Sequence, residues 1–206
     1  MIKNIILDLG GVVLNIDYNR TIEAFKDLGI PNALQFYSKQ QQAGLFDLLE
    51  IGKISARTFR NEIRKLTDVK LTDSAIDKAW NAMLLDFPEQ RMNTLIQLKQ
   101  HYKTFLLSNT NAIHFSAYTK ILQKKFNCNN LSDFFHKEFY SHLIHKRKPH
   151  PETFLFVLNS QKIKPSETLF IDDSIQHIKG AETVGLHTYH LTEESLETYL
   201  IRNQLL

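Results

Sequence analysis

Short apolar segments that end abruptly in polar residues limit most strongly how this chain can fold. Four such segments match β-strands: residues 2–7, 103–107, 168–171 and 186–189. A weaker fifth candidate covers residues 138–141. Nearly continuous apolarity, rather than strict alternation with polar residues, is typical of strands that are buried on both faces of a parallel sheet. We therefore expect a parallel sheet that is covered by helices.

Helical patterns occupy the chain between these strands. Pro88 and Pro151 each begin one of them, which fits because proline suits the first turn of a helix. A third helical pattern runs over residues 175–184 and ends before Gly185. Strands that alternate with helices indicate an α/β fold with a doubly wound parallel sheet.

Residues 19–86 interrupt this alternation, because they contain no convincing strand. Their apolar spacing matches four helices, over residues 21–28, 35–50, 55–66 and 72–85. Ser55 and Thr72 are suitable N-caps for the last two. We expect a helical cap subdomain over residues 17–86, inserted into a core domain formed by residues 1–16 and 87–206.

The composition excludes several other classes of protein. With 206 residues, of which 43% are hydrophobic, the chain can bury a sizeable core. A formal net charge of only +3 does not by itself demand a nucleic-acid partner. No apolar run reaches the roughly eighteen residues that a membrane helix needs. We expect a cytoplasmic protein, monomeric or homodimeric, with no nucleic-acid or membrane partner.

Three of the strongest strand candidates are followed at once by residues that can bind a phosphate or a metal. These are Asp8, Ser108 and the pair Asp172 and Asp173. In open α/β sheets such residues meet at the carboxyl ends of the strands, where ligands bind. Their carboxylates form a hard oxygen site suited to Mg²⁺. The Ser108 hydroxyl and the Lys148 ammonium can bind phosphate oxygens, so the set indicates phosphoryl transfer.

The same residues lie in four motifs, in an order that resembles the haloacid dehalogenase-like superfamily, in its phosphatase branch with a small helical cap. The motifs occupy residues 5–12, 106–111, 147–151 and 170–174. The resemblance extends over residues 1–190 and so covers almost the whole chain. It implies a Rossmann-like core, a helical cap and a Mg²⁺-dependent phosphatase that acts through an aspartyl-phosphate.

The resemblance also implies roles for individual residues. Asp8 stands in the position of the nucleophile, which attacks phosphorus. Ser108, the backbone of Asn109 and the Lys148 ammonium stand where the family binds the phosphoryl oxygens. The surrounding residues further resemble family members that hydrolyse sugar phosphates such as glucose 1-phosphate. We therefore expect the substrate to be a small phosphorylated metabolite.

A metal site is implied in the same way. Asp8, the carbonyl of Gly10 and Asp173 stand where the family holds Mg²⁺, and Asp172 would be a further ligand or would orient the others. Haloacid dehalogenases act without a metal, and their fourth motif does not keep this acidic pair. The pair therefore favours phosphate chemistry over dehalogenation.

Gly10 is a departure from the family pattern. Most family phosphatases carry a second aspartate two residues after the nucleophile, which acts as general acid and base. Glycine has no side chain to transfer a proton, and its turn can require a positive φ. The alternative function is therefore a catalytically weak or retired domain that binds a metabolite or a protein. Asp17 is a candidate for the missing carboxylate, although a helix N-cap is its simpler role.

Other conspicuous side chains have structural interpretations. The aromatic residues Phe46, Phe59 and Trp80 are expected in the core of the cap, with one of them able to face the substrate. His177 is expected to cap or orient the loop after the acidic pair. His142 and His145 have the spacing of a metal site, but without a third ligand in view we expect them to be solvated.

Overall fold

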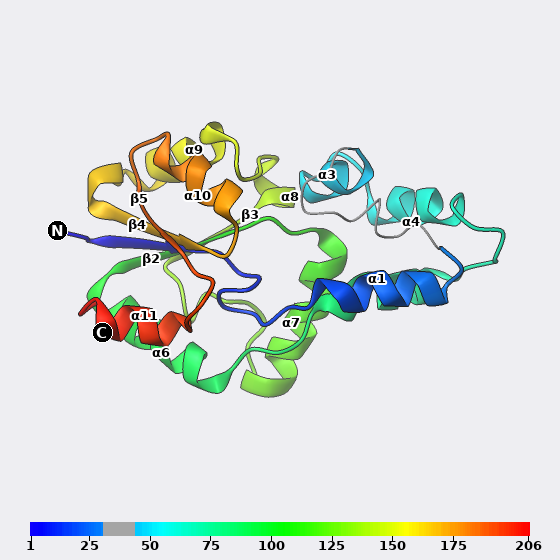
Figure 1. Cartoon of the computed structure of the whole chain (residues 1–206), viewed down its shortest axis with the longest axis horizontal. Helices are drawn as coiled ribbons and strands as arrows, with labels where there is room; N and C mark the ends of the chain where they lie inside the picture. Colours follow the sequence, from blue (N-terminus) through cyan, green and yellow to red (C-terminus); the bar gives the residue numbers. More distant parts are fainter. Residues whose placement is uncertain (31–43) are drawn as a thin grey trace.

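The computed structural model describes residues 1–30 and 44–206 and contains a five-stranded sheet in the order β3-β2-β1-β4-β5 (Figure 1). The strands are β1 (Asn4–Leu7), β2 (Lys103–Ser108), β3 (Lys137–Tyr140), β4 (Thr168–Asp172) and β5 (His187–His190). Each strand overlaps a predicted one, including the weak candidate at 138–141. All four strand pairs are parallel, which confirms the doubly wound α/β fold.

Helices cover both faces of the sheet (Figure 1). One face carries α6 (Glu89–His101), α7 (Ala112–Phe126) and α11 (Leu196–Arg202); the other carries α9 (Pro151–Gln161) and α10 (Ile175–Glu182). In β1, Ile5 and Leu7 pack with the first group of helices and Ile6 packs with the second. Because each face is buried, the strand is apolar throughout instead of alternating.

Three helices of the core, α7, α8 (Ser141–Ile144) and α11, have no counterpart among the predicted helices. Helix α7 begins after Asn111, whose side chain accepts hydrogen bonds from the backbone N–H groups of Ile113 and His114. Helix α11 begins after Ser195, which caps it in the same way. Both caps are readable in the sequence. The short helix α8 follows β3 directly.

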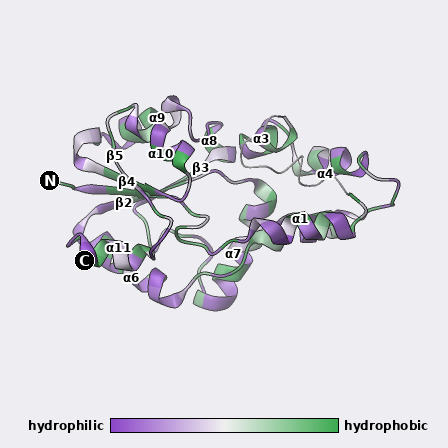
Figure 2. Cartoon of the chain, viewed as in Figure 1, coloured by the Kyte–Doolittle hydropathy of each residue, from purple (hydrophilic) through white to green (hydrophobic). Residues whose placement is uncertain are grey.

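The described residues between β1 and α6 form helices, as predicted. These are α1 (Tyr18–Asp27), α3 (Leu45–Glu50), α4 (Ala56–Arg64), α5 (Asp73–Trp80) and the 3₁₀ turn η1 (Asn81–Met83). Ser55 and Thr72 cap α4 and α5 as expected. The first part of the helix predicted over residues 35–50 lies outside the described residues. In Figure 2, hydrophobic and hydrophilic residues both occur along α1 and α4, as expected for helices with one buried face.

These helices have a hydrophobic cluster of their own, separate from the two clusters that flank the sheet. Two connections join them to the core, and they run side by side through an antiparallel bridge between Ile16 and Leu84. The backbone N–H of Asn15 also donates to the carbonyl of Asp86 at 2.9 Å. The domain boundaries at residues 16–17 and 86–87 stay a prediction.

None of the helices in the described part of the chain is long and apolar enough to cross a membrane.

Candidate active site

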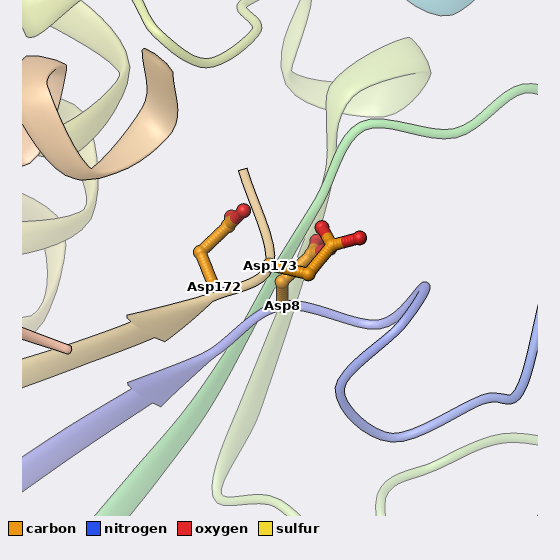
Figure 3. A group of neighbouring side chains, drawn as sticks. All are labelled: Asp8, Asp172 and Asp173. Atoms are coloured by element: carbon orange, nitrogen blue, oxygen red, sulfur yellow. The ribbon is translucent and has the colours of Figure 1, made fainter. Parts of the chain in front are cut away.

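The carboxyl ends of β1 and β4 bring the predicted acidic residues together (Figure 3). The two strands are neighbours in register, with Leu7 opposite Ile171, so Asp8 and Asp172 follow at the same level. The strand order reverses at this point: β2 and β3 extend the sheet on one side of β1, and β4 and β5 extend it on the other. Ligands of doubly wound sheets bind at such switch points.

The three carboxylates form a compact group. Asp8, Asp172 and Asp173 each offer an oxygen, and these oxygens lie within 4.8 Å of one another. Within residues 1–30 and 44–206, no other group of three such side chains has this geometry. Three ionised carboxylates at this separation repel one another strongly. Their hard oxygen atoms fit Mg²⁺, which would offset this repulsion.

Lys148 is the cation of the site and is completely buried. Its Nζ lies 2.6 Å from Oδ1 of Asp8 and 2.6 Å from Oδ2 of Asp172. Burial by itself lowers the pKa of Lys148, but the two carboxylates outweigh this effect, and the net pKa is raised. Lys148 therefore remains an ammonium, and it balances only one of the three negative charges.

The two carboxylates that hold Lys148 differ in their electrostatics. Burial raises the pKa of Asp8 to about 7, because the attraction of Lys148 does not compensate for lost solvation and for the repulsion of Asp172 and Asp173. Burial acts on Asp172 in the same direction, but Lys148 and His177 lower its pKa to about 2. Asp172 is thus the permanently ionised partner, and Asp8 is the carboxylate that a cation would stabilise most.

Asp172 is also the more constrained of the two. Its Oδ1 accepts hydrogen bonds from the backbone N–H of Ser174 at 2.8 Å and from Nδ1 of His177 at 2.9 Å. Because its Oδ2 accepts from Lys148, both oxygens already have protein partners. These contacts suit a residue that orients Lys148 and the loop after β4.

Asn109 has a contact that the sequence did not predict. Its side-chain nitrogen donates to the carbonyl of Lys148 at 2.9 Å, and its side-chain oxygen accepts from the backbone N–H of Lys148 at 3.0 Å. The loop after β2 thereby fixes the backbone that presents the ammonium. Ser108, at the end of β2, is 2% exposed and lines the cavity described below.

The glycine that requires a special backbone is Gly11, not Gly10. Gly11 has a φ of 74°, in the left-handed region, whereas Gly10 is outside that region. A Cβ added to Gly11 would lie 2.5 Å from Oδ2 of Asp173. At Gly10 the closest atom would be the flexible end of Ile16, at 3.0 Å. The expectation of a positive φ at Gly10 is therefore corrected, because the turn is made one residue later.

We expect Gly11→Ala to displace Asp173 and to weaken Mg²⁺ binding by about 10- to 100-fold, the range typical of changes that misplace a metal ligand. The substitution also adds backbone strain of about 1 kcal/mol or more. The measurement is the melting temperature at increasing Mg²⁺ concentration, from which the Mg²⁺ affinity is obtained. Gly10→Ala is the matched control and should have the smaller effect on Mg²⁺ affinity. Equal affinities in the parent and Gly11→Ala would contradict the predicted role of Asp173.

A cavity of about 400 Å³ opens beside the carboxylates. Core loops contribute one wall of it, including Asp8, Gly10, Ser108 and Asp173. The inserted helices contribute the other wall, formed by Tyr18, Asp47, Glu50, Trp80 and Met83. The site therefore lies between the core and the inserted helices.

Arg147 joins these two walls. It precedes Lys148 in the chain, and its guanidinium lies 2.8 Å from Oδ1 of Asp47 and 3.0 Å from Oε2 of Glu50. The side chains of Arg147 and Glu50 are each only 13% exposed. Burial raises the pKa of Glu50, and Arg147 partly offsets this effect. These ion pairs hold α3 against the segment that carries the buried ammonium.

The structure also places the remaining predicted residues. Asp17 accepts a hydrogen bond from the backbone N–H of Asn19, which confirms it as the N-cap of α1. It is not among the residues that line the cavity. Phe46, Phe59 and Trp80 are buried in the cluster of the inserted helices, as predicted, and Trp80 also faces the cavity.

The histidine predictions have mixed outcomes. His177 lies beside Asp172 and orients the loop, as expected. His142 is half-buried against Phe115 and Tyr140, and Nδ1 of His145 lies 2.9 Å from the carbonyl of Ile51. His145 is exposed, as predicted, although its ring contacts this backbone carbonyl. The prediction of a solvated side chain is wrong for His142, which is half-buried. Their neighbours include the segment after α3, which the sequence did not place against this loop.

Comparisons with known proteins agree with this geometry. The chain is 34% identical to a D-ribitol-5-phosphate phosphatase of Bacteroides thetaiotaomicron over 191 residues, which cover 92% of this chain and 91% of that protein. It is 31% identical over 106 residues to a glyceraldehyde 3-phosphate phosphatase of Pyrococcus furiosus, covering 51% of this chain and 41% of that one.

A solved structure is similar over nearly the whole chain. It is a HAD family enzyme of Bacteroides thetaiotaomicron, an aspartate-to-alanine mutant in complex with magnesium and inorganic phosphate. The two chains are 36% identical, the TM-score is 0.91, and the match covers 97% of this chain and 99% of the other. The family profile of haloacid dehalogenase-like hydrolases matches residues 2–185. The resemblance seen in the four motifs is thus confirmed, and the chain belongs to the haloacid dehalogenase-like hydrolases.

Proposed function

We propose that this protein is a Mg²⁺-dependent phosphatase that hydrolyses a small phosphorylated polyol or sugar. The observation that carries the proposal is the group of three carboxylates, two of which hold a buried ammonium, beside a cavity of about 400 Å³ that Asp8 and Asp173 line. The named activities of its relatives, on ribitol 5-phosphate and glyceraldehyde 3-phosphate, support this substrate class.

In this proposal the metal is held by Asp8, Asp173 and the carbonyl of Gly10, and Asp172 orients the site. When all three carboxylates are ionised, Lys148 leaves an excess of two negative charges, which matches a divalent cation. The cation supplies charge neutralisation, so that an anionic phosphate can approach an anionic nucleophile. Magnesium and inorganic phosphate in a solved relative support the same assignment.

The chemical steps follow from the placement of the side chains. A carboxylate oxygen of Asp8 attacks phosphorus, the bond from phosphorus to the ester oxygen breaks, and the leaving oxygen takes a proton from solvent water to become the alcohol. A water molecule then attacks phosphorus and returns one proton to the solvent, and the bond between phosphorus and the Asp8 oxygen breaks, which releases inorganic phosphate and restores the Asp8 carboxylate. The Ser108 hydroxyl and the Lys148 ammonium hold the phosphoryl oxygens, and Asn109 keeps the backbone of Lys148 in position.

Residues 17–86 act as the cap in this proposal. The cap carries one wall of the cavity and is tied to the core through Arg147. A closed cap would exclude bulk water and select the organic part of the substrate. The paired connection at Ile16 and Leu84 is a suitable hinge, because both chain crossings lie there.

The experiment is a screen of phosphate release from ribitol 5-phosphate, glucose 1-phosphate and glyceraldehyde 3-phosphate, each with Mg²⁺ and with EDTA. We expect turnover that requires Mg²⁺, with polyol and sugar monophosphates among the best substrates. Phosphate release that survives EDTA would contradict the metal assignment. Binding of Mg²⁺ and phosphate without any turnover would favour the retired domain that Gly10 suggests.

A further inference from the structure

His114 is a polar side chain of the cavity that none of the four motifs includes. It lies in the first turn of α7, just after the loop that begins with Ser108. The side-chain oxygen of Asn111 accepts a hydrogen bond from its backbone N–H at 3.1 Å, which anchors this turn. The residue is 7% exposed, so its ring has a defined environment.

Trp80, at the end of α5, fixes the chemical form of this ring. Nε2 of His114 lies 3.1 Å from the Trp80 carbonyl oxygen, which can only accept a hydrogen bond, so Nε2 must carry the proton. The same carbonyl accepts from the hydroxyl of Thr21 at 3.1 Å. The imidazole also packs on the Trp80 indole, with ring centroids 4.6 Å apart. Burial lowers the pKa of His114 to about 4, so the ring is neutral near pH 7.

The other ring nitrogen, Nδ1, is therefore a bare hydrogen-bond acceptor. Among the described residues, the hydrogen bond of the His114 side chain is the one at Nε2. Nδ1 is not a fully buried atom without a partner, so it is open to the space beside the ring. His114 lines the cavity, and the cavity is this space. A ligand that pairs with this nitrogen must donate a hydrogen bond.

The cap wall of the same cavity also favours a ligand group that is uncharged and donates a hydrogen bond. Its described residues include the carboxylates of Asp47 and Glu50, and among the described residues of the cavity these two face one guanidinium, that of Arg147. An excess of acceptors and of negative charge suits hydroxyl groups and disfavours a second phosphate or a carboxylate on the substrate. A polyol chain offers such hydroxyl groups.

Resting on the proposed phosphatase function, we propose that His114 is a specificity-determining residue whose Nδ1 accepts a hydrogen bond from a hydroxyl on the carbon chain of the bound phosphomonoester. Its partner Trp80 is the positioning residue, because it fixes both the tautomer and the plane of the ring. The phosphoryl group is bound elsewhere, by Ser108 and Lys148.

Two variants separate the ring nitrogens. His114→Gln places an amide nitrogen where Nε2 lies and so can keep the bond to Trp80, but it has carbon at the position of Nδ1. His114→Asn keeps a polar atom at the position of Nδ1 and loses the bond to Trp80. We expect His114→Gln to lower the ratio of kcat/KM for ribitol 5-phosphate to that for phenyl phosphate by about tenfold, the value of one hydrogen bond. His114→Asn should lower this ratio less.

An equal fall in kcat/KM for both substrates leaves the ratio unchanged; it would show that His114 only shapes the cavity and would overturn the proposal. Unchanged kcat/KM for both substrates would overturn it as well. A second readout avoids variants at this position: the ¹⁵N resonances of His114 in Asp8→Asn, with and without ribitol 5-phosphate. The proposal expects an unprotonated Nδ1 whose resonance shifts when the ligand binds, and an unshifted resonance in a saturated sample would overturn it. A parent protein that releases phosphate from no phosphomonoester overturns the proposed function itself, an outcome distinct from an unchanged ratio in an active enzyme.

Discussion

Asp8→Asn should abolish turnover and leave the fold intact. The amide oxygen can still accept the hydrogen bond from Lys148, which Oδ1 of Asp8 accepts at 2.6 Å, so the buried ammonium keeps a partner. The amide cannot serve as the nucleophile. Removing the nucleophile of other hydrolases costs up to about 10⁶ in rate, so we expect a loss of at least about a thousandfold. The measurement is phosphate release from ribitol 5-phosphate with Mg²⁺.

Asp17→Asn is the matched control for this variant. Asparagine caps a helix about as well as aspartate, and Asp17 lies outside the cavity, so turnover should stay close to that of the parent. Turnover by Asp8→Asn within tenfold of the parent would exclude the covalent mechanism. A large loss in Asp17→Asn would instead restore Asp17 as the carboxylate that moves the proton.

Asp8→Asn should also change how stability depends on pH. In the folded protein the pKa of Asp8 is raised to about 7, above its value in the unfolded chain, so the folded state favours the protonated carboxyl. The stability that this protonated form contributes to the parent is lost as the pH rises through 7. Without Mg²⁺ and above pH 7, the melting temperature of Asp8→Asn should therefore be no lower than that of the parent. Thermal unfolding at pH 5 and pH 8 in EDTA measures this difference.

Gly10→Asp should raise turnover of substrates with poor leaving groups by about 10²- to 10⁴-fold, the usual value of general acid–base catalysis. The backbone at Gly10 does not need the positive φ that would make an aspartate there unfavourable. Gly10 is outside the left-handed region, and an added Cβ would meet only the flexible end of Ile16. Gly10 lines the cavity beside Asp8, so a carboxylate there is near the leaving group. The added negative charge must be offset by Mg²⁺.

The comparison needs two substrates and one control variant. Ribitol 5-phosphate has a poor leaving group and should gain most, whereas p-nitrophenyl phosphate, whose leaving group needs little protonation, should gain almost nothing. In the control Gly10→Asn, the asparagine side chain is nearly as large as aspartate, but its amide cannot act as the general acid and base. Equal rates for the two variants on ribitol 5-phosphate would show that a proton donor at this position is not what limits the parent enzyme.

Much of the core could be predicted because its local signals agree with its packing. The strands are buried on both faces, and this produces apolar runs that end where the chain reaches the ligand edge of the sheet, as at Asp8 and Ser108. The N-caps Ser55 and Thr72 mark helices for an equally local reason. Helix α7 has an equally local cap in Asn111, but its apolar residues occur on several faces, so its sequence shows no single buried stripe.

By itself, the sequence determined the parallel α/β core, the inserted helices and the acidic, hydroxyl and ammonium groups that meet at one edge of the sheet. All of these depend on short-range patterns and on the rule that parallel strands end together. Only the tertiary structure decided that Gly11 approaches Asp173, that Arg147 pairs with α3, and that Trp80 fixes the tautomer of His114. These contacts join residues that are far apart in the chain. The first depends on how β1 and β4 pair in the core, and the other two depend on how the inserted helices dock. No local pattern encodes either arrangement.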